Sequence, residues 1–161
     1  MTVRVHEVVD KVKKIARAEV FDPARRDDDS WIDDNLPDNF DEHPVIDIDP
    51  LQDSNNAGQR SVGRMSYDEE RRIQVNIVHD TSLSHKLQGE NKERDGEIIL
   101  DEIVTQFKEA IVQDMDKKPS NSKLRGLSTD LRVIVDGQSE LPLDNSITQI
   151  SVDLLATMKR G

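Results

Sequence analysis

Histidine is the residue type in this sequence best suited to acid–base or metal chemistry near neutral pH. The chain has four histidines: His6, His43, His79 and His85. His79 and His85 lie six positions apart. Two imidazoles on one helix face need the spacing i, i+4, and no glutamate stands beside these two in the HExxH order. We therefore expect surface or strand-edge histidines, with metal ligation or base catalysis as the alternative.

Carboxylates offer a second kind of chemistry, because Ca²⁺ and Mg²⁺ bind several carboxylate oxygens at once. One acidic cluster comprises Asp27, Asp28, Asp29, Asp33 and Asp34. A closer match to a calcium loop is "DSNNAG", in which Asp53, Asn55 and Gly58 occupy positions 1, 3 and 6. The match then fails, because Ala57 replaces the third ligand and Arg64 replaces the bidentate glutamate. We therefore predict that the carboxylates of both segments lie solvated in loops and form no metal site.

The signatures of nucleotide binding and nucleophilic catalysis are missing from the sequence. It contains no GxxxxGK[ST], GxGxxG or GxSxG pattern and no cysteine. Phosphate cradles, nucleophile elbows and thiolate metal sites therefore lack their usual residues. We expect neither enzymatic activity nor a cofactor.

Basic residues cluster in two places although the chain is acidic overall. The first group is Arg60, Arg64, Arg71 and Arg72, and the second is Lys117, Lys118, Lys123 and Arg125. Such patches suit the acidic surface of another copy, since complementary charges select partner and register. The alternative is scattered, solvated charge that prevents sheets from pairing edge to edge.

The N-terminal half of the sequence predicts a helix, a long loop and two strands. Apolar residues at three- and four-residue steps predict an amphipathic helix over 4–19. Residues 22–43 are acidic and hold two prolines, with a third directly after them, so we expect an exposed loop. Its Trp31 and Phe40 are costly to leave in water, and they pin the loop either to its own domain, the preferred interpretation, or to a partner. Alternation predicts strands at 44–49 and 71–80.

The C-terminal half predicts a helix over 96–115, capped near Asp95, and two further strands. In "LRVIVDG", Leu131, Val133 and Val135 alternate, and Ile134 makes the strand apolar on both faces. That pattern indicates a central strand, or one covered on its second side by another subunit. Gly137 is expected to turn the chain into the last strand, within "SITQISVDLLATM".

This order of elements predicts an α+β fold. We expect one domain over residues 1–161, built as a mostly antiparallel sheet of four to five strands with two helices packed against it. The residues expected to make subunit or partner contacts are Arg60, Arg64, Arg71, Arg72, Ile134 and Trp31.

Composition favours assembly over nucleic-acid binding. The 33 acidic and 22 basic residues give a formal charge of −11, which repels phosphates. Hydrophobic residues make up only 34%, so either much of the chain is unpacked or a neighbouring subunit completes a small core. No apolar run reaches the roughly 18 residues of a membrane span, and the N-terminal residues lack a signal-peptide pattern. A protein made in the cytoplasm is the expectation. The acidity also resembles that of proteins from salt-loving organisms.

Taken from end to end, the chain resembles the small tail-terminator and tail-completion proteins of long-tailed viruses. The resemblance follows the order of an N-terminal helix ("VHEVVDKVKKIARAEV"), strands ("HPVIDIDP" and "RRIQVNIVHD"), a helix ("EIILDEIVTQFKEAIVQDM") and closing strands ("LRVIVDG" and "ITQISVDLLATM"). It rests on element order and length, without a signature motif. The long acidic loop at 22–43 departs from that pattern.

The resemblance implies a structural virion protein without enzymatic activity. It would form a ring of about six copies that caps the head-proximal end of the tail tube and joins the tube to a neck or head-completion protein. The genome would pass through without specific binding. Together with the acidity, the resemblance implies a virus of a halophilic archaeon. Two alternatives stay open: another virion connector, such as a neck, head-completion or tail-tube subunit, and a small acidic module that binds a basic partner.

Overall fold

The computed structural model describes residues 3–34, 42–51 and 67–160 of the 161-residue chain. Its helices are α1 (Val5–Glu19) and α3 (Gly96–Asp116). Its strands are β1 (Ile32–Asp34), β2 (Val45–Pro50), β3 (Tyr67–Asp80), β4 (His85–Lys86), β5 (Glu93–Arg94), β6 (Leu131–Asp144) and β7 (Ile147–Arg160).

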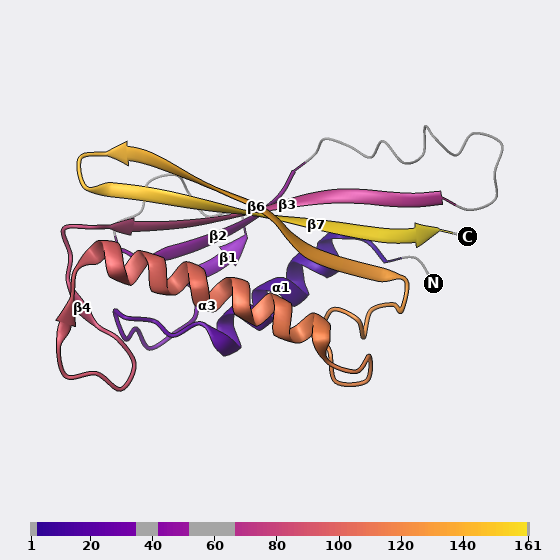
Figure 1. The fold of residues 1–161 in the computed structure, drawn as a ribbon, viewed down its shortest axis with the longest axis horizontal. Helices are drawn as coiled ribbons and strands as arrows, with labels where there is room; N and C mark the ends of the chain where they lie inside the picture. Colours follow the sequence, from indigo (N-terminus) through magenta and orange to yellow (C-terminus); the bar gives the residue numbers. More distant parts are fainter. Residues whose placement is uncertain (1–2, 35–41, 52–66, 161) are drawn as a thin grey trace.

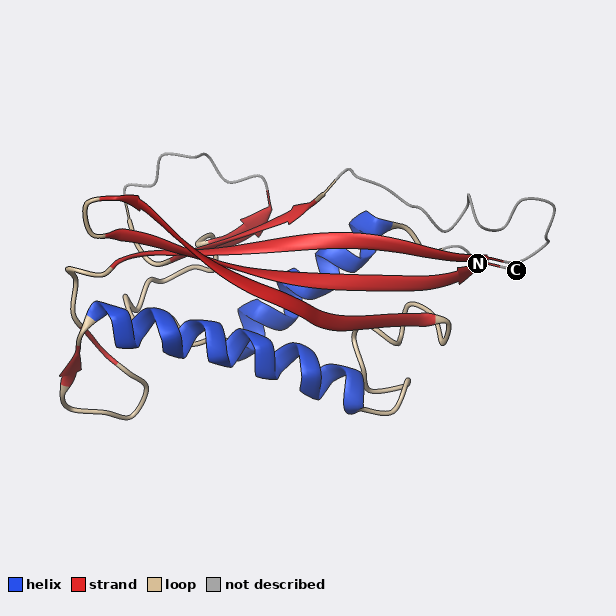
Figure 2. Cartoon of the chain, turned by 45° about the horizontal axis from the view of Figure 1, so that its top comes forward, coloured by secondary structure: helices blue, strands red, loops and turns tan. Residues whose placement is uncertain are grey.

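The main layer is a five-stranded sheet in the order β1-β2-β3-β7-β6. β1 runs parallel to β2, and every other neighbouring pair in this sheet is antiparallel. β4 and β5 form a separate two-stranded sheet. Figures 1 and 2 show α1 and α3 side by side on one face of the large sheet. The predicted α+β class, with a mostly antiparallel sheet and two packed helices, is therefore confirmed.

The core lies between the sheet and the helices, where the predicted alternation places it. Ile73, Val75 and Ile77 of β3 are fully buried, and each pairs with an apolar residue of β7. Phe107 of α3 is fully buried as well and packs in the same core cluster. Successive strand residues point to opposite faces, so this alternation leaves the second face of the sheet to polar side chains.

The acidic segment at 22–43 differs from the predicted exposed loop. Its described part contains β1, which forms the edge of the main sheet beside β2. Trp31 and Ile32 are buried in the core. Phe40 lies outside the described residues. Two buried apolar residues and a strand outweigh the acidity of this segment, so removing Asp27 to Asp34 would damage the core.

The predicted turn at Gly137 is also wrong. β6 continues past this glycine to Asp144, with an irregular register between Val135 and Gly137. The turn into β7 comes at Asn145, which adopts a left-handed backbone with φ of 43°. Asparagine is one of the few residues other than glycine that tolerates this conformation, which explains why the chain reverses there.

Candidate functional site

β6 is the outermost strand of the main sheet, with a strand partner on one side only among the described residues. The prediction of a central strand is therefore wrong, and the second alternative, a strand covered on its second side by another subunit, stays a prediction. Val133 is buried against the helices at 2% exposure, and its neighbour Ile134 is 38% exposed on the opposite face. Ile134 lies directly across from Leu155 of β7, forming a small apolar pair on that face.

A groove lies on the helix side of β6, between this strand and α3. It has a volume of about 450 Å³ and is lined by Lys108, Glu109, Val112, Gln113 and Val135. Val112 is half exposed, although it belongs to an amphipathic helix. We call these five residues the α3–β6 groove. The edge of the sheet thus presents apolar side chains on both sides of one unpartnered strand.

The rest of the open sheet face is polar and held by hydrogen bonds between strands. Ser151 Oγ donates to Asn76 Oδ1 at 2.8 Å, and Gln149 Nε2 donates to Ser151 Oγ at 3.0 Å. Asp153 pairs with Gln74 on the same face. Bonded side chains of this kind make a fixed surface without acid–base character.

The predicted arginine patch does not form one surface. Arg71 and Arg72 are consecutive residues of β3, so they point to opposite faces of the sheet. Arg72 lies on the open face and forms an ion pair with Asp136 of β6. Arg71 lies 4.0 Å from Glu69, and its Nε is buried without a hydrogen-bond partner. Arg60 and Arg64 lie outside the described residues.

Trp31 packs inside its own domain, as the preferred interpretation held. Its side chain is 4% exposed, and the guanidinium of Arg26 sits over the indole ring at 5.0 Å. Arg26 in turn pairs with Asp22 at 2.9 Å and donates to the carbonyl of Pro44 at 2.6 Å. This anchoring leaves Trp31 little surface for a partner.

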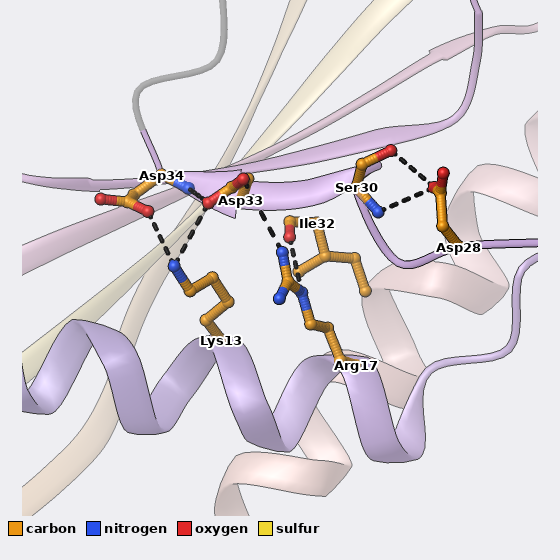
Figure 3. A network of polar contacts seen from close by, with 7 residues as sticks. All are labelled: Lys13, Arg17, Asp28, Ser30, Ile32, Asp33 and Asp34. Carbon is orange, nitrogen blue, oxygen red and sulfur yellow. Dashed lines mark hydrogen bonds and ion pairs between the residues drawn. The ribbon is translucent and has the colours of Figure 1, made fainter.

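Carboxylates of the acidic segment connect β1 to α1 (Figure 3). Lys13 Nζ donates to Asp33 Oδ1 at 3.2 Å and to Asp34 Oδ1 at 2.9 Å. Arg17 Nε donates to the carbonyl of Ile32 at 2.9 Å. The hydrogen bond from Lys13 lowers the pKa of the Asp34 carboxyl. Part of the acidic cluster is therefore held by hydrogen bonds to α1, which the run of acidic residues in the sequence did not indicate.

The fold brings together two histidines that their sequence spacing did not connect. His79 is fully buried at the end of β3, and its ring centroid lies 5.6 Å from that of His85 in β4. Neither nitrogen of His79 has a hydrogen-bond partner; the backbone of Leu83 is near, but its geometry falls short. Burial, with the neighbouring charge of His85, lowers the pKa of His79 to about 4.

The histidines do not amount to a metal centre in the part of the chain described. His43 also interacts with His79, and burial lowers the pKa of both His43 and His85. Across residues 3–34, 42–51 and 67–160, no group of three or more His, Cys, Asp or Glu residues could hold a metal ion. The imperfect calcium motif from Asp53 to Arg64 lies outside these ranges. The geometry supports a buried, neutral His79 beside a half-buried His85.

The second basic group sits on a loop fixed to the end of α3. Asp114 is buried and accepts hydrogen bonds from Ser122 Oγ at 2.8 Å and from the backbone of Lys123 at 2.9 Å. Arg125 donates to the carbonyl of Lys117 at 3.0 Å. We call residues 117–125 the basic loop. Because buried hydrogen bonds hold it, its charges are presented in a defined place beside the α3–β6 groove.

The comparisons with known proteins add no relative. No protein-family model matches the chain, and no curated protein matches it. Neither helix of the described residues is both long and apolar enough to cross a membrane. The surface features above therefore carry the functional argument.

Sequence reasoning found Ile134 but missed the groove beside it. Ile134 interrupts a strand alternation, which is visible in seven letters. The groove needs Val112 of α3 next to Val135 of β6, and no local pattern brings two such distant positions together. The available signal was Val112 itself, an apolar residue outside the predicted stripe of the second helix.

Proposed function

We propose that this protein is a structural subunit that assembles with its own copies into a ring. The observation that carries the proposal is the outer strand β6, which has exposed Ile134 on one side and the α3–β6 groove on the other. An unprotected strand edge is a template for pairing with another chain, and soluble proteins usually blunt it with charge, proline or a cover. β6 carries such features, with Pro142 and an irregular register between Val135 and Gly137. The exposed apolar side chains on its two sides, rather than the strand edge itself, therefore favour a partner in the assembled state.

We propose further that this ring is the tail terminator of a long-tailed virus. It caps the head-proximal end of the tail tube, contacts the tail-tube protein on one side and a neck or head-completion protein on the other, and belongs to the virion. This proposal rests on the resemblance in element order, and the α+β fold is compatible with it. A net charge of −11 also suits a channel through which DNA slides, since phosphates are repelled.

A direct test adds the purified protein to tail tubes and to tube subunits during polymerisation. A terminator stops tube growth and decorates one end, which electron microscopy of negatively stained tubes would detect. A tube subunit, which is the nearest competing connector, would instead polymerise alone into long tubes. Rings that never bind a tube end would contradict the terminator role.

An acidic binding module is the remaining alternative, and it makes a different prediction. Such a module would stay monomeric and would bind a basic partner through the acidic segment. The described part of that segment is tied to α1 and the core through Lys13, Arg17 and Trp31, so fewer of its carboxylates face outward than the sequence indicates. That observation favours assembly.

A further inference from the structure

Two exposed apolar side chains lie close together at one end of β6. Leu141 is 52% exposed and Leu143 is 46% exposed, and they flank Pro142. We call Glu140–Asp144 the β6 tip. Transfer of a leucine side chain from water into an apolar contact is favourable. Two exposed leucines on one short segment therefore favour a contact that covers them.

The β6 tip is held in a fixed position. The carbonyl of Ser146, just past the tip, accepts hydrogen bonds from the backbone N–H of Thr81 at 2.9 Å and from its hydroxyl at 2.8 Å. Ser146 Oγ also donates to Asp80 Oδ1 at 2.5 Å. A segment that is already ordered loses little entropy when it binds, so the tip is suited to insertion.

The two ends of β6 lie in surroundings of opposite charge. The tip carries Glu140 and Asp144 and no basic residue, whereas the basic loop at 117–125 carries four cations and no carboxylate. Figure 1 shows the tip at the left end of the molecule and the end of α3, with the loop that follows it, at the right. An acidic end and a basic end on one molecule attract each other between copies.

The groove lies too far from the tip of the same chain to receive it. Val135 of the groove and Leu141 of the tip are six residues apart on one strand, which corresponds to about 20 Å at 3.3 Å per residue. The groove contributes Val112 and Val135 as apolar lining, and its charged residues are the cation Lys108 and the carboxylate Glu109. Lys108 already donates to Gln138 at 2.7 Å, and its ammonium has two further donors.

We propose that the β6 tip of one copy docks into the α3–β6 groove of the next copy. Leu141 and Leu143 fill the groove against Val112 and Val135, and the tip carboxylates face Lys108 and the basic loop. Each copy then uses two different surfaces, one at either end. Contacts of this head-to-tail kind close into rings or continue as filaments. The inference rests on the proposed ring assembly and names the surfaces that make it.

The test uses two variants of the full chain, each damaging one surface. The tip variant carries Leu141→Lys and Leu143→Lys, and the groove variant carries Val112→Asp. All three side chains are exposed, so both variants should keep the circular dichroism spectrum and the melting temperature of the original. By light scattering, each variant alone is expected to lose assembly and run as a monomer.

Mixing the two variants gives the decisive result. The tip variant keeps an intact groove and the groove variant keeps an intact tip, so an equimolar mixture can form one junction and no more. We expect a heterodimer without larger species. The matched control is Ile98→Asp, which changes an equally exposed apolar residue of α3 outside the groove and should still assemble.

The possible failures can be told apart. If the unmodified protein assembles but the tip or groove variant also assembles fully, or the mixture stays monomeric, the tip-to-groove contact is wrong while the ring proposal survives. Loss of assembly in the Ile98→Asp control would also overturn the assignment to the groove. If the unmodified protein never assembles, the proposed function itself fails.

Discussion

At the scale of single residues, the costliest feature is the buried imidazole of His79. Its position inside the protein disfavours the charged ring, and neither nitrogen gains a hydrogen bond in return. Such groups need an explanation, because a buried polar atom without a partner costs about 1–3 kcal/mol. The nearby rings of His85 and His43 add charge repulsion when His79 and one of them both carry a proton.

His79 should make the protein lose stability as the solution becomes acidic. Its pKa is about 4 in the fold and ordinarily 6.5. Between those two pH values the unfolded chain binds a proton that the folded chain does not, so the free energy of unfolding falls as pH falls through this window. The shift corresponds to a loss of about 3 kcal/mol, complete near pH 4.

The variant His79→Phe tests this origin, because it keeps a buried ring and removes the titration. Urea unfolding at several pH values between 4 and 7 should show a shallower loss of stability than in the original protein. His6→Phe, at an exposed histidine of α1, controls for the substitution. An unchanged slope in His79→Phe would mean that other groups cause the acid sensitivity.

Trp31→Ala distinguishes a core residue from a partner contact. Removing the buried indole should destabilise the isolated protein by about 3–5 kcal/mol, because it leaves a cavity beneath Arg26. Thermal unfolding of dilute protein measures the effect. If the melting temperature stayed unchanged while binding to a partner was lost, Trp31 would belong to an interface instead.

At the scale of elements, the two faces of β6 differ in burial, since Val133 lies in the core and Ile134 is partly exposed. Val133→Asp places an unpaired charge in the core, and several kcal/mol of destabilisation are expected. Ile134→Asp, one position further on the more exposed face, should change monomer stability by no more than about 1 kcal/mol. Chemical denaturation of the two variants below the concentration of assembly compares the faces directly. Equal losses would show that Ile134 is also a core residue of the subunit.

The elements with a strong periodicity were predictable from sequence. The helix stripe of α1 and the alternation in β3 each repeat over a dozen or so residues, and burial of one face enforces such repeats. β1 was not predictable, because it spans three residues in an acidic run and acquires its place through Lys13 and β2. The second half of β6 has no buried face, so its sequence carries no alternation to read.

The candidate site shows the same division. Ile134 was predictable because one apolar residue broke a local pattern, and its exposure on an outer strand agrees with the covered-by-a-subunit alternative. The placement of the arginines was not predictable in the same way. Arg71 and Arg72 are neighbours in the sequence, but they point to opposite sides of a strand. Contacts between distant elements, such as His79 with His85 or Val112 with Val135, depend on the tertiary fold alone.

At the scale of the whole molecule, the arrangement of one sheet with helices on a single face accounts for the acidic charge and the low share of apolar residues. Helices cover one face of the sheet and hydrogen-bonded polar residues cover much of the other, so the subunit folds around a single layer of core. Among the described residues, the large apolar side chains that stay exposed include Ile134, Leu141 and Leu143 of β6 and Val112 of the groove, together with Leu83 and Ile98. We propose that the subunit buries these side chains against neighbouring copies, which is the central claim of the ring proposal.

The mass of the purified protein in solution tests that claim most directly. Light scattering at low salt and at molar salt, with negative-stain images of the same samples, would measure it. We predict closed rings of about six copies, each copy of 18.3 kDa, at one or both salt concentrations. A single-subunit mass at both, across the concentrations that can be reached, would contradict the account.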